Sequence, residues 1–261
     1  MSTSRTLFDV EGPIAFLTFN RPEARNAMTW EMYEALVDAC ERVDGDTAIR
    51  AFVLRGAGGK AFVAGTDISQ FTSFSTLDDA LAYERRLDAV IDRLERVAAA
   101  TIAQVQGVAA GGGCAIALAC DLRVCTPDSR FGVPIARTLG NCLSAANYAR
   151  LIDLLGPASV KDLLFTGRLI DASEAASLGL VTRMAEPSAV DETVRELAAT
   201  IAANAPMTIR ATKEAVRRIQ AARRIDEPQA DDLIAMCYGS EDFKEGVAAF
   251  LAKRPPVFKG R

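Results

Sequence analysis

The chain has 261 residues, of which half are hydrophobic and a quarter are charged. This length and composition fit an ordinary folded protein with a sizeable core and exclude a disordered, collagen-like or disulfide-scaffold chain. Histidine is absent, so the chain can form no Ser-His-Asp triad, no Cys-His dyad and no histidine zinc site. The net charge of -4 does not supply the basic field that non-specific nucleic-acid binding requires, so we expect no nucleic-acid partner.

The six cysteines contain no C-x-x-C pair. Without histidine partners they also lack the spacing of a structural zinc site, so we expect no metal centre. Residues 1–10 alternate polar and apolar side chains and do not form the apolar run of a signal peptide. We therefore interpret the cysteines as reduced, mostly buried side chains of a cytoplasmic protein.

Short β-rich segments mark the first half of the chain. They lie at residues 14–19, 51–54, 101–105 and 121–125, and each is followed by turn residues or a helical pattern. After Thr29, a plausible N-cap, apolar residues recur at helical spacing as far as residue 43. Strands that alternate with helices predict crossover units, a mainly parallel sheet and an α/β fold.

Residues 97–120 are the one candidate for a membrane span, because they form a run of 24 uncharged residues. Thirteen of these are Ala or Gly, and the triplet 111–113 would interrupt a spanning helix. We expect no membrane association. The segment instead predicts a buried strand, a glycine-rich turn and a short buried helix at about residues 112–120.

The second half of the chain carries helical spacing. The predicted helices cover residues 158–165, 172–177, 191–203 and 208–219, and a last helix begins after Ser240. This last helix has an apolar stripe made of Phe243, Val247, Phe250 and Leu251. Such a stripe fits packing on the protein's own core or docking to another subunit, and the first is the more common arrangement.

Two glycine-containing stretches, residues 60–68 and 106–115, lie at predicted strand-to-helix junctions. The first N–H groups of a helix have no partner inside the helix, and glycine lets a ligand oxygen approach them. Taken alone, three glycines before a helix are more often a turn or a tight packing contact than an anion site. The stretches match neither a P-loop nor a dinucleotide-binding fingerprint.

These two stretches, together with residues 20–27, 167–181 and 245–254, resemble the enoyl-CoA hydratase/isomerase family of the crotonase superfamily. The resemblance extends over nearly the whole chain. It implies a spiral of strand-strand-helix units over residues 1–195 and a C-terminal helical oligomerisation region over residues 196–261, in a homotrimer or a dimer of trimers. The substrate would be an acyl-CoA thioester, with coenzyme A as part of the substrate and no tightly bound cofactor.

The resemblance also implies the site residues. The thioester oxygen would be held by the backbone N–H groups of Thr66 and Gly112, which form an oxyanion hole. Coenzyme A would contact one group of residues in the same chain and two in a neighbouring subunit: Ala24, Arg25, Lys60, Ala64, Asp67 and Ile68, with Phe250 and Lys253 from the neighbour. Each of these cations also fits an ordinary solvated charge, and Asp67 also fits a helix cap.

The match to the family breaks at its two catalytic glutamates. Those positions correspond here to Ala115 and Ile135, and neither side chain can carry a proton. Ala115 follows Gly112 by three residues, which places both on one face of the predicted helix. Five nearby polar residues could substitute, and each also fits packing or a turn: Arg137, Asn141, Cys142, Ser144 and Tyr148.

The sequence is compatible with three functions. The first is an enoyl-CoA hydratase or isomerase whose proton transfer uses another group or an ordered water. The second is a decarboxylation or C–C cleavage, which needs enolate stabilisation more than a strong base. The third is a non-catalytic acyl-CoA-binding protein.

Overall fold

The computed structural model describes residues 4–73, 76–225 and 227–261. Its larger sheet contains six strands. Their spatial order is β1 (Thr6–Glu11), β2 (Ile14–Phe19), β3 (Ala51–Gly56), β5 (Ala100–Val105), β7 (Leu122–Cys125) and β10 (Arg183–Met184). Only β1 pairs antiparallel with its neighbour, and the other pairs are parallel. The predicted mainly parallel sheet is confirmed.

A second, four-stranded sheet consists of β4 (Ala61–Val63), β6 (Val108–Ala110), β8 (Arg130–Gly132) and β9 (Ile170–Asp171). The chain passes from the larger sheet to this one three times, from β3 to β4, from β5 to β6 and from β7 to β8. A helix follows each passage: α2 (Leu77–Glu95), α3 (Gly112–Ala119) and α4 (Ile135–Thr138). This repetition confirms the expected spiral of strand-strand-helix units.

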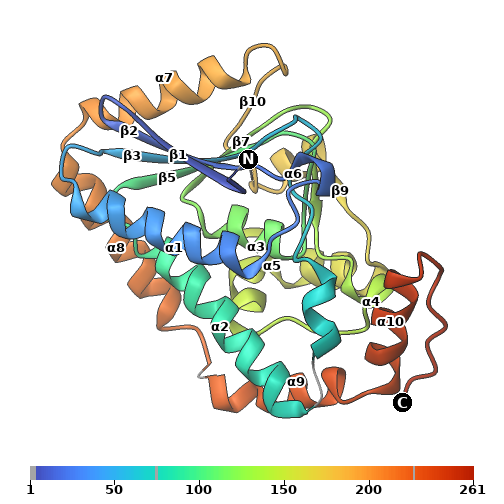
Figure 1. Ribbon diagram of the computed structural model, residues 1–261. Coiled ribbons are helices and arrows are strands. Elements are labelled where there is room, and N and C mark those ends of the chain that lie inside the picture. The colour runs from blue at the N-terminus through green and yellow to red at the C-terminus, as the bar shows by residue number, and fades with distance from the viewer. Residues whose placement is uncertain (1–3, 74–75, 226) are drawn as a thin grey trace.

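Helices cover both faces of the larger sheet (Figure 1). On one face Phe16 and Val53 pack with Val194 and Leu197 of α7 (Val190–Ala203). On the other face alternate residues such as Leu17 join the main core beneath α1 (Trp30–Gly45), α2 and α3. Because both faces are buried, the inner strands read as nearly continuous apolar runs.

The remaining helices belong to the second half of the chain: α5 (Ala145–Thr166), α6 (Ala172–Ser177), α8 (Pro206–Ala221), α9 (Asp231–Tyr238) and α10 (Glu241–Leu251). Three short 3-10 helices complete the fold: η1 (Pro22–Ala24), η2 (Ile68–Ser73) and η3 (Glu227–Ala230). The helix α5 is kinked at Gly156, before Pro157. The predicted helices at 158–165, 172–177, 191–203 and 208–219 therefore exist.

The sequence prediction omitted several elements. It placed no strand at β1, β4, β6, β8, β9 or β10, and no helix at α2, α4 or α9. Five of these strands have only two or three residues and carry no measurable periodicity; they form because the spiral brings them beside a partner. The longer elements β1 and α2 have the length to show a pattern, and the prediction missed them. The segment 97–120 divides into β5, β6 and α3, so the expected glycine-rich turn contains a strand. Among the described residues, no helix combines the length and apolar character needed to cross a membrane.

The apolar stripe of α10 divides between two environments. Ser240 caps the helix, since the Phe243 N–H donates to its Oγ at 3.0 Å. Phe243 is 5% exposed, whereas Phe250 and Leu251 are 50% and 48% exposed. Packing on the protein's own core is therefore correct for Phe243 and wrong for Phe250 and Leu251. The division of the chain between residues 195 and 196, which falls within α7, remains a prediction.

Candidate active site

The buried side chain of Asn26 holds the first predicted binding segment in place. Its Oδ1 accepts from the Arg21 N–H at 2.9 Å, and its Nδ2 donates to the carbonyls of Ala57 and Ala61 at 3.0 and 2.9 Å. Asn26 has a φ of 57°, a left-handed conformation that Asn tolerates better than most residues. These bonds tie the segment after η1 to the connection between β3 and β4.

The segment anchored by Asn26 lies against the loop that follows β4. The N–H of Ala64 donates to the carbonyl of Arg25 at 3.0 Å, and the Met28 N–H donates to Gly65 at 2.8 Å. The Asp67 N–H donates to the Met28 carbonyl at 2.8 Å. The structure therefore brings together Ala24, Arg25, Ala64 and Asp67, which the resemblance placed in one site.

Thr66 and Gly112 are also brought together. Gly112 is the first residue of α3, so the helix itself does not use its N–H. Within the described part of the chain, the Thr66 N–H likewise donates to no protein acceptor. A Cβ built on Gly112 would lie 2.9 Å from Thr66 Oγ1 and 3.7 Å from Thr66 N. Two unused backbone donors therefore lie close together, as an oxyanion hole requires.

This approach of α3 to β4 depends on Gly113. A Cβ at that position would lie 2.1 Å from the carbonyl oxygen of Val63, at the end of β4. Any side chain would therefore push the start of α3 away from the loop that carries Thr66. The need for glycine at 113 is steric, independent of the backbone conformation.

Two tyrosines that sequence reasoning missed surround the Thr66 side chain. The Tyr33 hydroxyl lies 2.8 Å from Thr66 Oγ1, and the Tyr83 hydroxyl donates to the same atom at 3.3 Å. They are 0% and 6% exposed, and burial raises the pKa of both phenols. The helical stripe of Tyr33, Leu36 and Cys40 could have placed Tyr33 in the core, but only the fold brings it to Thr66.

Asp67 is engaged in local structure. Its carboxylate accepts from the Ser69 N–H at 3.1 Å at the start of η2 and pairs with Arg21 at 2.7 Å. Burial opposes its ionisation, but the hydrogen bonds from Ser69 and Arg21 outweigh that effect and lower its pKa. The interpretation of Asp67 as a cap is confirmed.

The two positions that the resemblance aligns with the family's glutamates lie in apolar surroundings. Ala115 is 5% exposed on α3, and Ile135 is the first residue of α4 and packs against the main core. Of the possible substitutes, Ser144 caps α5 and donates to Asp88 at 2.7 Å, and Asn141 donates to the Tyr238 hydroxyl at 3.0 Å. Both therefore have structural partners.

The other possible substitutes differ in their surroundings. Cys142 is 6% exposed, and its thiol lies 3.4 Å from the Leu233 carbonyl. Tyr148 is half-buried on α5, and burial raises its pKa to about 12. Arg137 is exposed.

Glu84 is a buried carboxyl group that no sequence pattern singled out. It is 6% exposed on α2 and accepts a hydrogen bond from the Tyr238 hydroxyl of α9. Burial raises its pKa to about 8, and the charge of Asp88 acts in the same direction. Glu84 therefore binds a proton far more tightly than an ordinary glutamate does.

The remaining predicted coenzyme A contacts lie in two places. Arg25 and Lys60 are exposed, and Ile68 begins η2. Phe250 lies in the last turn of α10, and Lys253 follows the end of this helix. The helix packs on η2 of its own chain through the rings of Phe71 and Phe243, whose centroids are 6.0 Å apart. A cavity of about 440 Å³ lies between η2, α2, α9 and α10.

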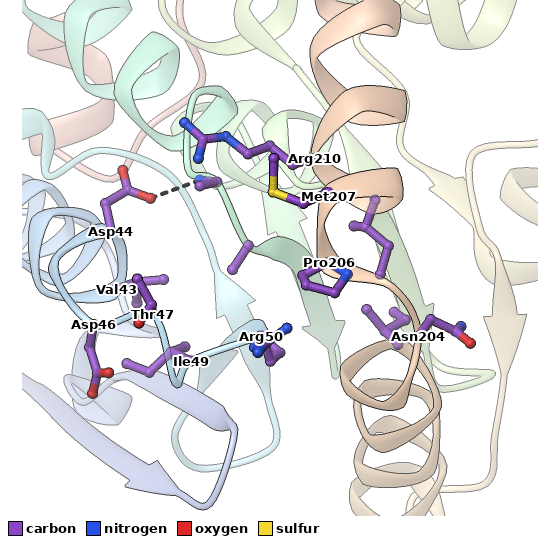
Figure 2. A pocket seen from close by; sticks show the side chains of 14 residues that line it. Val43, Asp44, Asp46, Thr47, Ile49, Arg50, Asn204, Pro206, Met207 and Arg210 are labelled. Atoms are coloured by element: carbon purple, nitrogen blue, oxygen red, sulfur yellow. Dashed lines mark hydrogen bonds between the residues drawn. The ribbon is translucent and has the colours of Figure 1, made fainter.

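A separate cavity of about 230 Å³ lies between the end of α1 and the start of α8 (Figure 2). Met207 and Arg210 approach it from α8, and Asp44 on the α1 side accepts a hydrogen bond from the Ala98 N–H at 2.8 Å. None of its 14 lining residues is a predicted site residue. This cavity is therefore not the predicted thioester site.

Comparison with known proteins identifies the family. The model of the enoyl-CoA hydratase/isomerase family matches residues 9–261. The short-chain-enoyl-CoA hydratase of Clostridium acetobutylicum is 35% identical over 256 residues, which cover 97% of each chain. An enoyl-CoA hydratase/carnithine racemase structure from Magnetospirillum magneticum is 34% identical with a TM-score of 0.80, covering 100% of this chain and 97% of that one.

A second solved structure is closer in backbone. Methylmalonyl-CoA decarboxylase in complex with 2-nitronate-propionyl-CoA has a TM-score of 0.91 at 26% identity, with 100% of both chains covered. The chain belongs to the enoyl-CoA hydratase/isomerase family of the crotonase superfamily. It is an acyl-CoA enzyme of that family.

The substitution Asn26→Asp tests the anchor of the site. It removes two donated hydrogen bonds and introduces a charge at a position that is 0% exposed. We expect a loss of about 3 kcal/mol in the free energy of unfolding, measured by urea denaturation. The matched control is Asn20→Asp, whose amide bonds to Ser4 at the surface; a loss in Asn26→Asp no larger than in this control would contradict the role of Asn26.

The raised pKa of Glu84 predicts that the free energy of unfolding depends on pH. Its ordinary pKa is 4.5 and its folded value is about 8, so the folded state binds the proton more tightly. Its contribution to stability is therefore fully present below about pH 4.5 and is lost as the pH rises through about 8. We expect Glu84→Gln to flatten the fall in unfolding free energy over this range by a few kcal/mol. The exposed Glu41→Gln should leave the slope unchanged, and an unaltered slope in Glu84→Gln would refute the assignment.

Proposed function

We propose that the protein stabilises the enolate of an acyl-CoA thioester between the backbone N–H groups of Thr66 and Gly112. The observation that carries this proposal is the proximity of these two unused donors, on segments 46 residues apart in the chain. Each donor that is already in position lowers the activation free energy by about 3 to 4 kcal/mol, because it stabilises the developing oxyanion. Such a site lowers the barrier to chemistry at the carbon beside the carbonyl.

The binding of coenzyme A follows from the same proposal. Its phosphates require local cations on a protein with a net charge of -4, and Arg25 and Lys60 are exposed beside the site loops. Ala24, Ala64, Asp67 and Ile68 would line the path of the nucleotide and pantetheine. Phe250 and Lys253 would contact coenzyme A bound to a neighbouring subunit.

A homotrimer or a dimer of trimers fits the exposed apolar side chains of the C-terminal helices. Met207, Ile219 and Phe250 are 71%, 65% and 50% exposed. An interface that covers these side chains would remove apolar surface from water, which stabilises an oligomer. This feature supports residues 196–261 as an oligomerisation region.

For the reaction, the first candidate is an enoyl-CoA hydratase or isomerase. Its support is the Clostridium acetobutylicum short-chain-enoyl-CoA hydratase, at 35% identity. Water addition or double-bond migration moves a proton at a substrate carbon, and a general base must reach that proton. With Ala115 and Ile135 at the glutamate positions, another group or an ordered water would have to transfer it.

The second candidate is decarboxylation of a 2-carboxyacyl-CoA. Loss of CO2 leaves the electron pair of the broken C–C bond on the α-carbon, so the enolate forms without a base. Two observations support this reaction: the apolar residues at 115 and 135, and the TM-score of 0.91 to methylmalonyl-CoA decarboxylase. A water molecule or a nearby hydroxyl would then supply the proton to the α-carbon.

Two assays on the whole chain separate these reactions. One follows loss of the conjugated absorbance of crotonyl-CoA, and the other follows CO2 release from methylmalonyl-CoA and malonyl-CoA. We expect turnover above the uncatalysed rate in at least one assay, and the assay that responds identifies the reaction. Binding of acetyl-CoA without turnover in either assay would instead support an acyl-CoA-binding protein. Absence of both binding and turnover would overturn the proposal.

Gly112→Ala tests the oxyanion hole. The new Cβ would lie 2.5 Å from the Tyr33 hydroxyl and 2.9 Å from Thr66 Oγ1, so the two donor segments must separate. We expect kcat/KM to fall about 100-fold or more while circular dichroism remains that of the folded protein. The control is Gly45→Ala, where a Cβ meets nothing within 4 Å. Equal activity in the two variants would exclude Gly112 as a donor.

A further inference from the structure

Three hydroxyl groups meet beside the two backbone donors: those of Tyr33, Thr66 and Tyr83. Tyr33 comes from α1 and Tyr83 from α2, and both reach Thr66 Oγ1, at 2.8 and 3.3 Å. The same Oγ1 lies 2.9 Å from the Cβ position of Gly112, closer than the Thr66 nitrogen at 3.7 Å. The hydroxyl of Thr66 therefore lies on the side of the residue that faces Gly112.

The direction of the hydrogen bonds follows from burial. Tyr83 donates to Thr66 Oγ1. Tyr33 is 0% exposed, and among the described residues its hydroxyl has no partner besides Thr66. A buried O–H that donates to nothing costs about 1 to 3 kcal/mol, so Tyr33 is the donor in its bond to Thr66. Burial raises the pKa of both phenols, so both keep their protons.

Thr66 Oγ1 thus accepts two hydrogen bonds. A hydroxyl has two acceptor sites and one hydrogen, so both acceptor sites of Thr66 are filled and its hydrogen is left to donate. Within the described part of the chain no protein acceptor takes this hydrogen. Thr66 is only half-buried, in contrast to the two tyrosines.

We propose that the Thr66 hydroxyl is a third donor to the enolate oxygen of the acyl thioester, held in the donating orientation by Tyr33 and Tyr83. This inference rests on the proposed function. Thr66 then supplies two donors, its N–H and its O–H, and Gly112 supplies the third. In this proposal Tyr33 and Tyr83 are positioning residues, because they act through their hydrogen bonds to Thr66 Oγ1.

A third donor suits this site in particular. Positions 115 and 135 carry apolar side chains, so neither of them can supply the carboxylic acid that would protonate the enolate. Hydrogen bonds to the enolate oxygen must therefore supply a larger share of the reduction in the activation free energy. Donors that are fixed before the reaction contribute without reorganisation at the moment the charge develops.

The test uses Thr66→Val, which removes the hydroxyl and keeps both the backbone N–H and the side-chain shape. On whichever substrate the wild-type protein turns over, we expect kcat to fall about 100-fold with little change in KM, because the donor acts mainly in the transition state. Thr200→Val, on the surface of α7, is the matched control and should be unchanged.

Tyr33→Phe tests the positioning role. It frees one acceptor site of Thr66 and lets the Thr66 hydrogen turn away, so we expect kcat to fall about 10-fold. The double variant Tyr33→Phe/Thr66→Val should be no less active than Thr66→Val alone, because Tyr33 acts only through the hydroxyl that is already removed. Additive losses in the double variant would contradict the positioning role.

A measurement without turnover completes the test. The infrared carbonyl band of bound acetyl-CoA, labelled with carbon-13 at the carbonyl, should lie at lower frequency in the wild-type protein than in Thr66→Val, because each hydrogen bond weakens the C=O bond. Equal kcat and equal band positions would overturn the third donor and leave the proposed function standing. A wild-type protein that neither binds nor converts acyl-CoA would overturn both.

Discussion

The structure depends on the close approach of the N-terminus of α3 to the end of β4. The approach is possible because residue 113 has no side chain where the Val63 carbonyl lies 2.1 Å from a Cβ position. It brings the first turn of α3, with its unpaired N–H groups, beside the loop that carries Thr66. The larger sheet, the spiral of strand-strand-helix units and the helices on both faces all serve to fix these two chain segments relative to each other.

The hydrogen-bond donors of the proposed site are neutral, and the carboxyl groups near them are paired or protonated. The nearby carboxylates are either paired, as Asp67 is with Arg21 at 2.7 Å, or buried and proton-binding, as Glu84 is with a pKa of about 8. The phenols of Tyr33 and Tyr83 keep their protons because burial raises their pKa. A site with neutral donors, whose neighbouring carboxyl groups are either paired with a cation or protonated, is suited to receive a developing anion.

The chain combines the fold of its family with apolar side chains, Ala115 and Ile135, at the two positions that the resemblance aligns with catalytic glutamates. The enolate stabilisation that we propose for Thr66 and Gly112 would depend on backbone donors and would not require those glutamates. Proton transfer depends on particular side chains, so the two properties can vary separately on one fold.

The sequence by itself determined the long, strongly patterned features. The parallel strands 14–19 and 51–54, the helix after Thr29, the buried helix at 112 and the pairing of Thr66 with Gly112 could all be predicted, because periodicity and glycine placement are local and the remaining link came from family resemblance. Only the tertiary structure decided the rest. Two-residue strands such as β9 and β10, the convergence of Tyr33 and Tyr83 on Thr66, and the buried contact of Glu84 with Tyr238 join segments tens of residues or more apart, and no local pattern records a contact that exists only after the chain has folded.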